Sequence, residues 1–454
     1  MFLLGARSEL SPDASQNLDR VSSLGVRVDE ILEENALPQV DKGLEGADLA
    51  IDAIFGTGFK GVPRGVAAGA IEILNEARVP IVSIDIPSGL DATTGRAEGM
   101  CVRANATYTM GLLKRGLTLY PGRELAGIVE VLDIGIPESV VDAMALRIEA
   151  LDREWAKVRL PTRRPDVHKG DCGHVLVVGG STGLSGAVAL ASRAAMRAGA
   201  GLVTALVPRS LNAVLEIKLT EPMTRPMDET AQGSLAATAE KAIVEWLGKC
   251  DVVALGPGVS RVPETAALVR RIVAASPIPV VLDADGLNAF EALGDELARA
   301  GAPLVITPHA GEMSRLFGIA ASELDKDRIG TAIAAASRFR CVVVYKGAPT
   351  VIAAPDGRTY LNPTGNAGMA TGGTGDVLTG MIAGLIGQGC APFEGAALAA
   401  YLHGLAGDFA VRQLGVWGLL AGDLIEALPD AMLAVWKDED TESDDDDDDS
   451  EEEV

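Results

Sequence analysis

Residues 362–376 read NPTGNAGMATGGTGD, and an apolar stretch without proline, Val377–Ile386, follows directly. The repeated glycines allow backbone N–H groups to converge on an anion. A helix that begins here would add the partial positive charge of its N-terminus. The segment therefore predicts a phosphate-binding loop that leads into a buried helix.

Asp376 closes this loop and falls in the first turn of the expected helix. An isolated Gly-Asp before a helix is usually an ordinary N-cap. Capping needs one residue, however, whereas the GGTGD segment supplies four further neighbours that together shape an anion site. The glycine density therefore favours a functional role for Asp376 beside a bound phosphate.

Short apolar runs alternate with helical patterns around this loop. The expected strands of the C-terminal half are Val175–Val178, Leu202–Val207, Val252–Leu255, Val280–Asp283, Leu304–Thr307 and Cys341–Tyr345. Such alternation predicts a mainly parallel sheet with helices on both faces, that is, an α/β fold. Val351–Ala354 and Thr359–Leu361 flank Pro355-Asp356-Gly357 and predict a β-hairpin. Residues 376–436 are expected to be helical.

The N-terminal half shows the same alternation. Its expected strands are Asp48–Phe55, Pro80–Ile84, Ala106–Met110 and Ile128–Ile134, with a helix from Pro63 to Ala77. Residues 149–173 are charged and contain two prolines, which predicts a linker. We therefore expect a domain over residues 1–148 and a second over 149–437. Residues 438–454 hold 13 acidic side chains and no basic one, so they should form a disordered tail.

Composition excludes several classes of protein. The 454 residues carry a formal charge of −24, which argues against nucleic acid or an anionic membrane as a partner. The five cysteines are widely spaced without a CxxC, and the four histidines lack HExxH spacing, so a disulfide framework and a transition-metal site are not expected. No stretch predicts a signal peptide or a transmembrane helix. The composition is typical of a cytoplasmic protein.

The GGTGD loop resembles that of the ribokinase-like superfamily, in which the Asp of GxGD is a base toward a substrate hydroxyl. Five further segments narrow the resemblance: HVLVVGGSTGLSGA (174–187), ALGPGV (254–259), LDADGLNA (282–289), ITPHAGEM (306–313) and KGAPT (346–350). In this order they are similar to ADP-dependent (S)-NAD(P)H-hydrate dehydratase, the C-terminal half of the bifunctional NAD(P)H-hydrate repair enzymes. The resemblance spans about residues 165–430.

The resemblance implies roles for individual residues. Those that would bind the hydrate are Ala187, Gly258, His309 and Asp376, and those that would bind the adenine nucleotide are Lys346, Gly347, Ala348, Pro349, Thr350 and Gly375. Structural alternatives exist: Lys346 could be a surface lysine at a strand end, and His309 could equally cap the next helix. Gly258 could serve a turn, and Ala187 could serve close packing. Strand-end carboxylates are common, so we assign no metal ligand to Asp283 or Asp285.

The implied chemistry is kinase-like. Asp376 would deprotonate the hydroxyl of the hydrated ring, ADP would phosphorylate it, and phosphate would leave to regenerate the dihydronicotinamide. The resemblance implies the substrates NADHX and NADPHX, with AMP and phosphate as the other products, and Mg²⁺ as a cofactor. We also expect a homo-oligomer.

Two N-terminal segments, DAIFGTG (52–58) and DIPSG (85–89), look like those of the NAD(P)H-hydrate epimerase domain. The resemblance implies hydrate contacts at Gly56, Thr57, Gly58, Phe59, Lys60, Gly61, Val62 and Asp85, and potassium ligands at Asp52 and Ser88. Either segment could instead be only a turn. The family's upstream Asn-Gly-Gly-Asp-Gly loop has no match here, so we expect a truncated Rossmann-like domain with impaired epimerase activity.

Two other functions compete with this interpretation. A ribokinase-like kinase for a vitamin precursor, such as hydroxyethylthiazole, would share the GxGD loop. The KGAPT and PHAGE segments and the fused N-terminal half favour the dehydratase. A non-catalytic nucleotide-binding module is the second alternative, although it would have no need of a base at Asp376.

Overall fold

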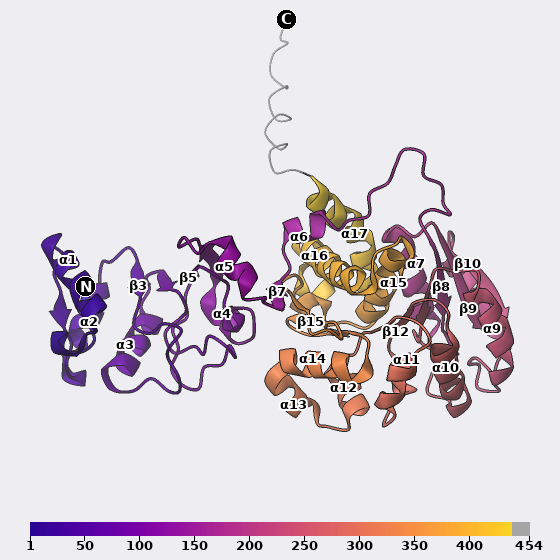
Figure 1. Ribbon diagram of the computed structural model, residues 1–454, viewed down its shortest axis with the longest axis horizontal. Helices are drawn as coiled ribbons and strands as arrows, with labels where there is room; N and C mark the ends of the chain where they lie inside the picture. The colour runs from indigo at the N-terminus through magenta and orange to yellow at the C-terminus, as the bar shows by residue number, and fades with distance from the viewer. Residues whose placement is uncertain (438–454) are drawn as a thin grey trace, which may run out of the picture. The chain divides into compact units, whose positions relative to one another are not determined.

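The computed structural model describes residues 1–437, so the predicted acidic tail lies outside the described residues. The chain divides into two compact units, Met1–Leu146 and Arg147–Val454, both drawn in Figure 1. Each unit has its own sheet, and we describe each by itself.

The C-terminal unit is built on a ten-stranded sheet. In spatial order its strands are β10 (Met223–Met227), β9 (Leu202–Pro208), β8 (His174–Val178), β11 (Val252–Leu255), β12 (Val280–Leu282), β13 (Leu304–Ile306), β14 (Val342–Tyr345), β15 (Thr350–Ala353), β16 (Thr359–Asn362) and β7 (Ile148–Ala150). Only β15 runs antiparallel to its neighbours, because it forms the predicted hairpin with β16. The central strands are buried throughout, as expected of a parallel sheet covered on both faces.

Helices cover both faces of this sheet (Figure 1). One group consists of α6 (Arg153–Lys157), α7 (Ser185–Arg197), α15 (Thr374–Gly387), α16 (Pro392–Gly418) and α17 (Ala421–Trp436), and the other of α10 (Pro263–Ala275), α11 (Asp285–Asn288), α12 (Ala310–Phe317), α13 (Ala321–Leu324) and α14 (Arg328–Phe339). Two further helices, α8 (Asn212–Lys218) and α9 (Glu240–Leu247), pack against β10 and α10 respectively. The α/β class with a mainly parallel, doubly covered sheet is thus confirmed.

Helix α15 is the central helix of this unit. Residues 377–386 are all buried, so the helix is apolar on every side. Gly380 and Gly384 bring it close to α7: a Cβ at Gly380 would clash with the Ala191 carbonyl oxygen, and one at Gly384 would lie 2.7 Å from that of Ala195. The N-terminal end of α15, which carries the predicted loop, is therefore fixed by close packing on α7.

The N-terminal unit holds a parallel sheet in the order β3 (Ala50–Asp52), β4 (Ile81–Ile84), β5 (Ala106–Met110) and β6 (Ile128–Leu132). A separate pair is formed by β1 (Phe2–Leu3) and β2 (Asp29–Glu30), and the helices are α1 (Pro12–Ser23), α2 (Pro38–Leu44), α3 (Gly65–Glu76), α4 (Gly122–Ala126) and α5 (Glu138–Ala143). One face of the larger sheet buries Ala50 and Ile81, whereas the other leaves Ile51 64% and Ile128 77% exposed.

The predicted linker over residues 149–173 is partly wrong. Residues 148–150 form β7, which pairs in parallel with β16, and α6 follows directly. Leu151, Ala156 and Leu160 are buried in the core of the C-terminal unit. These three apolar side chains anchor the segment. The charged residues and prolines around them obscured the apolar pattern in the sequence. Across residues 1–437, no helix combines the length and apolar character needed to cross a membrane.

Candidate active site at the start of helix α15

The carboxyl ends of three neighbouring parallel strands converge beside α15. Asp283 follows β12, Glu312 lies in the first turn of α12 after β13, and Lys346 follows β14. The Lys346 Nζ lies 2.8 Å from Asp283 Oδ1 and 3.8 Å from Glu312 Oε2. The Lys346 side chain is only 20% exposed, so it is no ordinary surface lysine. The strand ends thus place one cation among several carboxylates.

The glycine loop passes directly by this cation. A Cβ built on Gly375 would lie 3.2 Å from Lys346 Nζ and 3.6 Å from Asp283 Oδ2. Any side chain at this position would therefore crowd the ammonium group. Gly373 begins α15 with a left-handed backbone (φ +96°), which glycine adopts without strain. The loop sequence thus lets backbone N–H groups and the Lys346 ammonium face the same space.

Asp376 lies in the first turn of α15 and is largely buried. Burial raises the pKa of its carboxyl to about 7, and the negative charge of Asp283 raises it further, while Lys346 acts in the opposite direction. A carboxyl with a pKa near neutrality can exchange a proton readily at physiological pH, which is the property that general-base catalysis requires.

Helix α16 holds the glycine loop in place. The Asp408 carboxylate accepts hydrogen bonds of 2.9 Å from the Gly365 N–H and from Asn366 Nδ2. Buried His403 bonds the Thr374 carbonyl oxygen through Nε2 at 2.9 Å. Burial lowers the pKa of His403 to about 4, so the ring is neutral and Nε2 donates. The loop is therefore fixed at both ends before any ligand binds.

Ala187 and Gly258 come together at the start of α7. A Cβ on Gly258 would lie 3.3 Å from the Ala187 Cβ and 2.7 Å from the Leu184 carbonyl oxygen, and Gly258 has φ +66°. The Ser181 hydroxyl donates to the Gly258 carbonyl oxygen at 2.8 Å. Turn geometry therefore gives a structural reason for Gly258, and close packing gives one for Ala187. The two predicted site residues lie next to each other in the fold.

His309 caps helix α12. Its Nδ1 accepts hydrogen bonds from the N–H groups of Gly311 (3.0 Å) and Glu312 (3.3 Å), while the Glu312 carboxylate accepts from the His309 N–H at 2.9 Å. The capping alternative is therefore observed, and the other ring nitrogen, Nε2, lies 3.4 Å from Glu312 Oε2. Burial raises the pKa of Glu312 to about 7, which adds a second titrating carboxyl beside Lys346.

Arg328, the first residue of α14, stabilises the start of the KGAPT segment. It donates to the carbonyl oxygen of Lys346 at 2.9 Å and stacks 4.1 Å from the centre of the Tyr345 ring. A side chain on Gly347 would clash with the Arg328 guanidinium. Sequence reasoning missed Arg328 and Asp408, because each lies in a helix that carries no recognisable motif.

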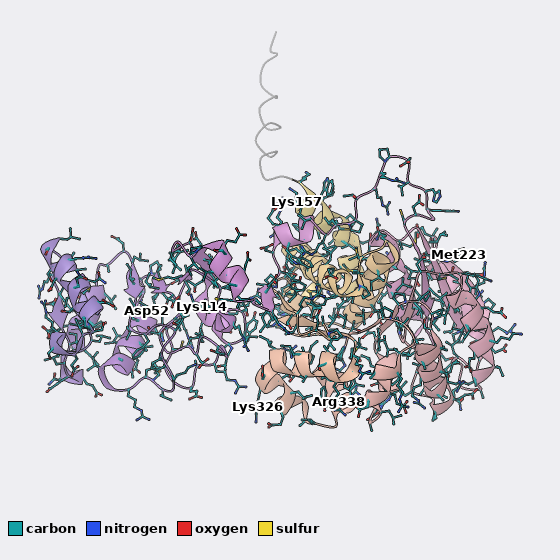
Figure 2. All side chains as sticks on the ribbon, viewed as in Figure 1. Asp52, Lys114, Lys157, Met223, Lys326 and Arg338 are labelled. Carbon is teal, nitrogen blue, oxygen red and sulfur yellow. The ribbon has the colours of Figure 1, made fainter. Side chains whose placement is uncertain are left out.

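The N-terminal unit brings its predicted cation ligands together. Asp52 is fully buried and accepts hydrogen bonds from the Ser83 hydroxyl (2.8 Å), the Ser88 N–H (2.9 Å) and the Ser88 hydroxyl (2.6 Å). Figure 2 shows Asp52 in this unit. The Ile54 N–H also donates to Asp52 Oδ1 at 3.3 Å, so each carboxylate oxygen accepts two hydrogen bonds. The oxygens suit potassium in kind, but a bound cation would have to replace some of these bonds.

Asp85 is held by a lysine that sequence reasoning missed. Lys114 Nζ lies 2.7 Å from Asp85 Oδ1, and the Met110 N–H donates to the same oxygen at 3.2 Å. Burial alone would raise the pKa of Asp85, but these partners hold it below the ordinary value. Gly56 lies beside this carboxylate, since a Cβ there would be 3.9 Å from Asp85 Oδ2. Asp85 directly follows β4, and Lys114, labelled in Figure 2, follows the neighbouring strand β5.

Two residues of the 56–62 segment, both predicted hydrate contacts, make contacts within the N-terminal unit. Lys60 forms an ion pair with Asp91 at 2.7 Å. Phe59 stacks on Phe55 with ring centres 4.3 Å apart. These contacts fix the segment beside the end of β3.

Mg²⁺ fits the C-terminal site only together with a nucleotide. No group of three or more His, Cys, Asp or Glu among residues 1–437 is arranged to hold a metal. Mg²⁺ commonly binds through substrate phosphates and one or two carboxylates rather than in a protein cage. The carboxylates around Lys346 suit that mode, and we assign no individual ligand.

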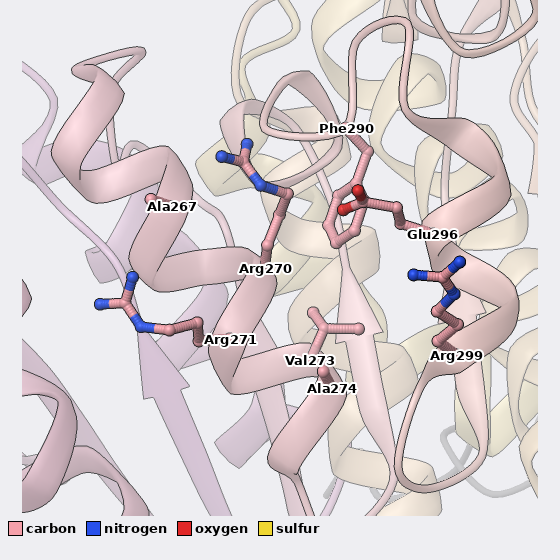
Figure 3. Close-up of a pocket in the computed structure, with 8 residues that line it drawn as sticks. All are labelled: Ala267, Arg270, Arg271, Val273, Ala274, Phe290, Glu296 and Arg299. Atoms are coloured by element: carbon pink, nitrogen blue, oxygen red, sulfur yellow. The ribbon is translucent and has the colours of Figure 1, made fainter.

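A cavity of about 390 Å³ lies elsewhere in the C-terminal unit (Figure 3). It is lined by α10 and the segment after it, at Ala267, Arg270, Arg271, Val273, Ala274, Phe290, Glu296 and Arg299. None of the sequence-predicted site residues lines it. Arg270 is bound to the Ala289 carbonyl oxygen and Arg271 to Glu240, so this cavity is separate from the chemistry described above.

Comparisons with known proteins agree with this site. Residues 175–430 match the family described as NAD(P)H-hydrate dehydratase, and residues 1–116 match that described as YjeF-related protein N-terminus. The chain is 48% identical to the bifunctional NAD(P)H-hydrate repair enzyme Nnr of Moorella thermoacetica, over 94% of this chain and 81% of that protein. The Escherichia coli K12 enzyme of the same name is 36% identical over 85% and 71% of the two chains.

Solved structures resemble the C-terminal unit. The ADP/ATP-dependent NAD(P)H-hydrate dehydratase of Bacillus subtilis, co-crystallised with ATP and Mg²⁺, superposes with a TM-score of 0.55 at 30% identity, over 64% of this chain and 99% of that chain. A ribokinase-like superfamily protein of Enterococcus faecalis gives a TM-score of 0.55 at 25% identity, over 63% and 96% of the two chains.

The fold and the glycine loop therefore define a ribokinase-like enzyme. More closely, the chain belongs to the family of bifunctional NAD(P)H-hydrate repair enzymes, and residues 175–430 are its NAD(P)H-hydrate dehydratase domain. The resemblance and the dehydratase function expected from the sequence are both confirmed.

Proposed function

We propose that the C-terminal unit dehydrates the S form of NADHX and NADPHX with ADP as phosphoryl donor, and that AMP and phosphate are the other products. The observation that carries this proposal is the position of Asp376, whose pKa is raised to about 7, beside Lys346 and the glycine loop. We take residues 149–437 as the dehydratase domain and residues 1–148 as an epimerase-like domain.

The reaction needs a base and a better leaving group than hydroxide. The Asp376 carboxylate accepts the proton of the ring hydroxyl, whose oxygen then attacks the terminal phosphorus of ADP, and AMP departs. Inorganic phosphate then leaves by C–O cleavage, and loss of a proton from the adjacent ring carbon restores the double bond of the dihydronicotinamide. General-base assistance contributes on the order of 10²–10⁴-fold to such a step.

The remaining groups bind and orient the two ligands. The loop N–H groups, the N-terminus of α15 and the Lys346 ammonium face the phosphates and offset the charge that develops on them. When bound, Mg²⁺ supplies further charge neutralisation at the phosphates. In this proposal the hydrate contacts Ala187, Gly258 and His309, and the nucleotide contacts residues 346–350 and Gly375.

The test uses the purified full chain and racemic hydrate. Dihydronicotinamide absorbance is followed with and without ADP, and inorganic phosphate is measured in parallel. ADP-dependent recovery of absorbance with equal phosphate release supports the proposal. A stable phosphorylated alcohol from hydroxyethylthiazole or a similar precursor, without recovery of absorbance, would support the kinase alternative instead.

The N-terminal unit has a narrower role in this proposal. Asp85 and the 56–62 segment bind the hydrate, and Asp52 and Ser88 bind potassium. These two side chains alone give a cation few ligands, so we propose weak epimerase activity.

Two further parts of the proposal concern the whole protein. A homo-oligomer is supported by the exposed apolar residues Ile51 and Ile128 on one sheet face, and light scattering of the purified chain tests it. A cytoplasmic location is supported by the five free cysteines.

A further inference from the structure

Asp283 is the most deeply buried charge at the dehydratase site. Its residue is 1% exposed, and both carboxylate oxygens are used: Oδ1 accepts from Lys346 Nζ and Oδ2 from the Thr379 hydroxyl, each at 2.8 Å. Burial alone would raise the pKa of Asp283, but Lys346 holds it below the ordinary value. A buried ion pair adds little net stability, because desolvation offsets the attraction. Stability therefore does not explain this pair.

The two partners of Asp283, Lys346 and Thr379, both lie close to Asp376 in the fold. Lys346 comes from the end of β14 and faces the backbone at Gly375. Thr379 lies on α15, three residues after Asp376 and therefore one turn further along the helix. Asp283 thus links the strand that carries the cation to the helix that carries the base.

We propose that Asp283 is a positioning residue for the dehydration: it holds the Lys346 ammonium beside the loop at Gly375, and through Thr379 it fixes the first turn of α15 so that Lys346 and Asp376 keep their spacing. This inference rests on the function proposed above. Asp283 touches no reacting atom and acts through its two partners.

Asp283 also sets part of the charge that Asp376 faces. The charged groups around Asp376 are Asp283 after β12, Asp285 on α11, Glu312 on α12 and Lys346 after β14. His403 on α16, which bonds the nearby Thr374 carbonyl oxygen, is neutral. The three carboxylates disfavour ionisation of Asp376, and Lys346 favours it. Removal of the Asp283 charge should therefore let Asp376 ionise at lower pH, an effect that a purely structural role would not produce.

The first experiment is a double-mutant cycle in the full chain. Asp283→Asn, Lys346→Met and the double variant are compared for turnover, KM for ADP and the pH dependence of turnover. We expect Asp283→Asn to lower turnover at least about tenfold and to move the acid limb of the profile to lower pH. In the Lys346→Met background it should cost little more. Independent, multiplicative losses with an unmoved acid limb would overturn the proposal.

Matched variants separate positioning from folding. Asp295→Asn makes the same change in a surface ion pair with Arg338 (2.7 Å) and should leave turnover unchanged. Thr379→Ser keeps the hydroxyl bond to Asp283 and should retain most activity, whereas Thr379→Val should lose it. If Asp283→Asn does not fold, this Thr379 pair decides: equal activity of the two variants would overturn the proposal.

ADP binding keeps the inference separate from the proposed function. If the wild-type chain fails to dehydrate the hydrate, the proposed function is wrong, and the affinity for ADP measured by calorimetry then decides about Asp283. Asp283→Asn should weaken ADP binding about as much as Lys346→Met, and the double variant no further. Unchanged ADP affinity in Asp283→Asn would overturn the inference.

Discussion

Asp376 has the position, the burial and the charge environment of a general base. Asp376→Asn keeps the size of the side chain but cannot accept the hydroxyl proton. We expect turnover to fall by about two to four orders of magnitude, with ADP binding retained. Steady-state dehydration rates and calorimetric ADP affinity check this prediction. Near-normal turnover in the variant would show that another group is the base.

The raised pKa of Asp376 also affects stability. Because this pKa is about 7 in the folded chain, against 3.8 for an ordinary aspartate, the folded state holds the proton more tightly than the unfolded state does. Wild-type stability should therefore decrease as pH rises from about 4 to about 7 through this group. Asp376→Asn does not titrate, so its stability relative to the wild type should increase over the same range. Urea unfolding at pH 5 and pH 8 measures the difference, and a gain that is equal at both pH values would contradict the assigned pKa.

At the scale of elements, Gly380 and Gly384 let α15 pack closely on α7, and this packing determines where the glycine loop lies. A methyl group at Gly380 would clash with the backbone of Ala191 on α7. We expect Gly380→Ala to destabilise the chain by about 1–3 kcal/mol, as overpacking does, and to lower turnover through displacement of the loop. Gly422→Ala on α17 is the matched control, because nothing lies within 4 Å of a Cβ there. That variant should be neutral or stabilised. Thermal melts of the two variants check the prediction, and equal melting temperatures would contradict it.

The central elements were predictable because their sequences carry strong signals. Val252–Leu255 and Ala106–Met110 match β11 and β5 residue for residue. The edge strands were missed: β10 reads MTRPM with exposed Arg225 and Pro226, and β7 is three residues long. Edge strands need no continuous apolar run, since one side faces solvent, so their pairing is decided by neighbours distant in the sequence.

At the scale of the whole molecule, loop motifs were easier to find than the residues that support them. Glycine-rich segments indicate local backbone geometry directly from the sequence. They were enough to predict the loops that contain Asp376 and Lys346. Asp408 contacts Gly365, which is 43 residues away in the chain, and Arg328 contacts Lys346, which is 18 residues away; only the folded structure brings these residues together. His309 shows the limit of motif reasoning, because the structure shows its role as a helix cap, whereas its implied ligand role stays a prediction.

The last prediction concerns the N-terminal unit, in which the proposed hydrate-binding carboxylate is better preorganised than the proposed cation site. Lys114 at 2.7 Å holds the pKa of Asp85 below its ordinary value, so the carboxylate that we propose as a hydrate contact is preorganised. The cation pair is less complete, because Asp52 and Ser88 supply few oxygens and already bond each other at 2.6 Å, whereas hard cations favour a full shell of oxygen ligands. We therefore expect slow epimerisation of the R hydrate at best. The assay supplies only the R hydrate without ADP and follows the S form by chromatography, with spontaneous epimerisation measured separately. Asp85→Asn serves as the control and should reduce any residual rate to the spontaneous one. Rapid, potassium-dependent conversion by the wild-type chain would contradict the prediction and would mean that further ligands complete the potassium site.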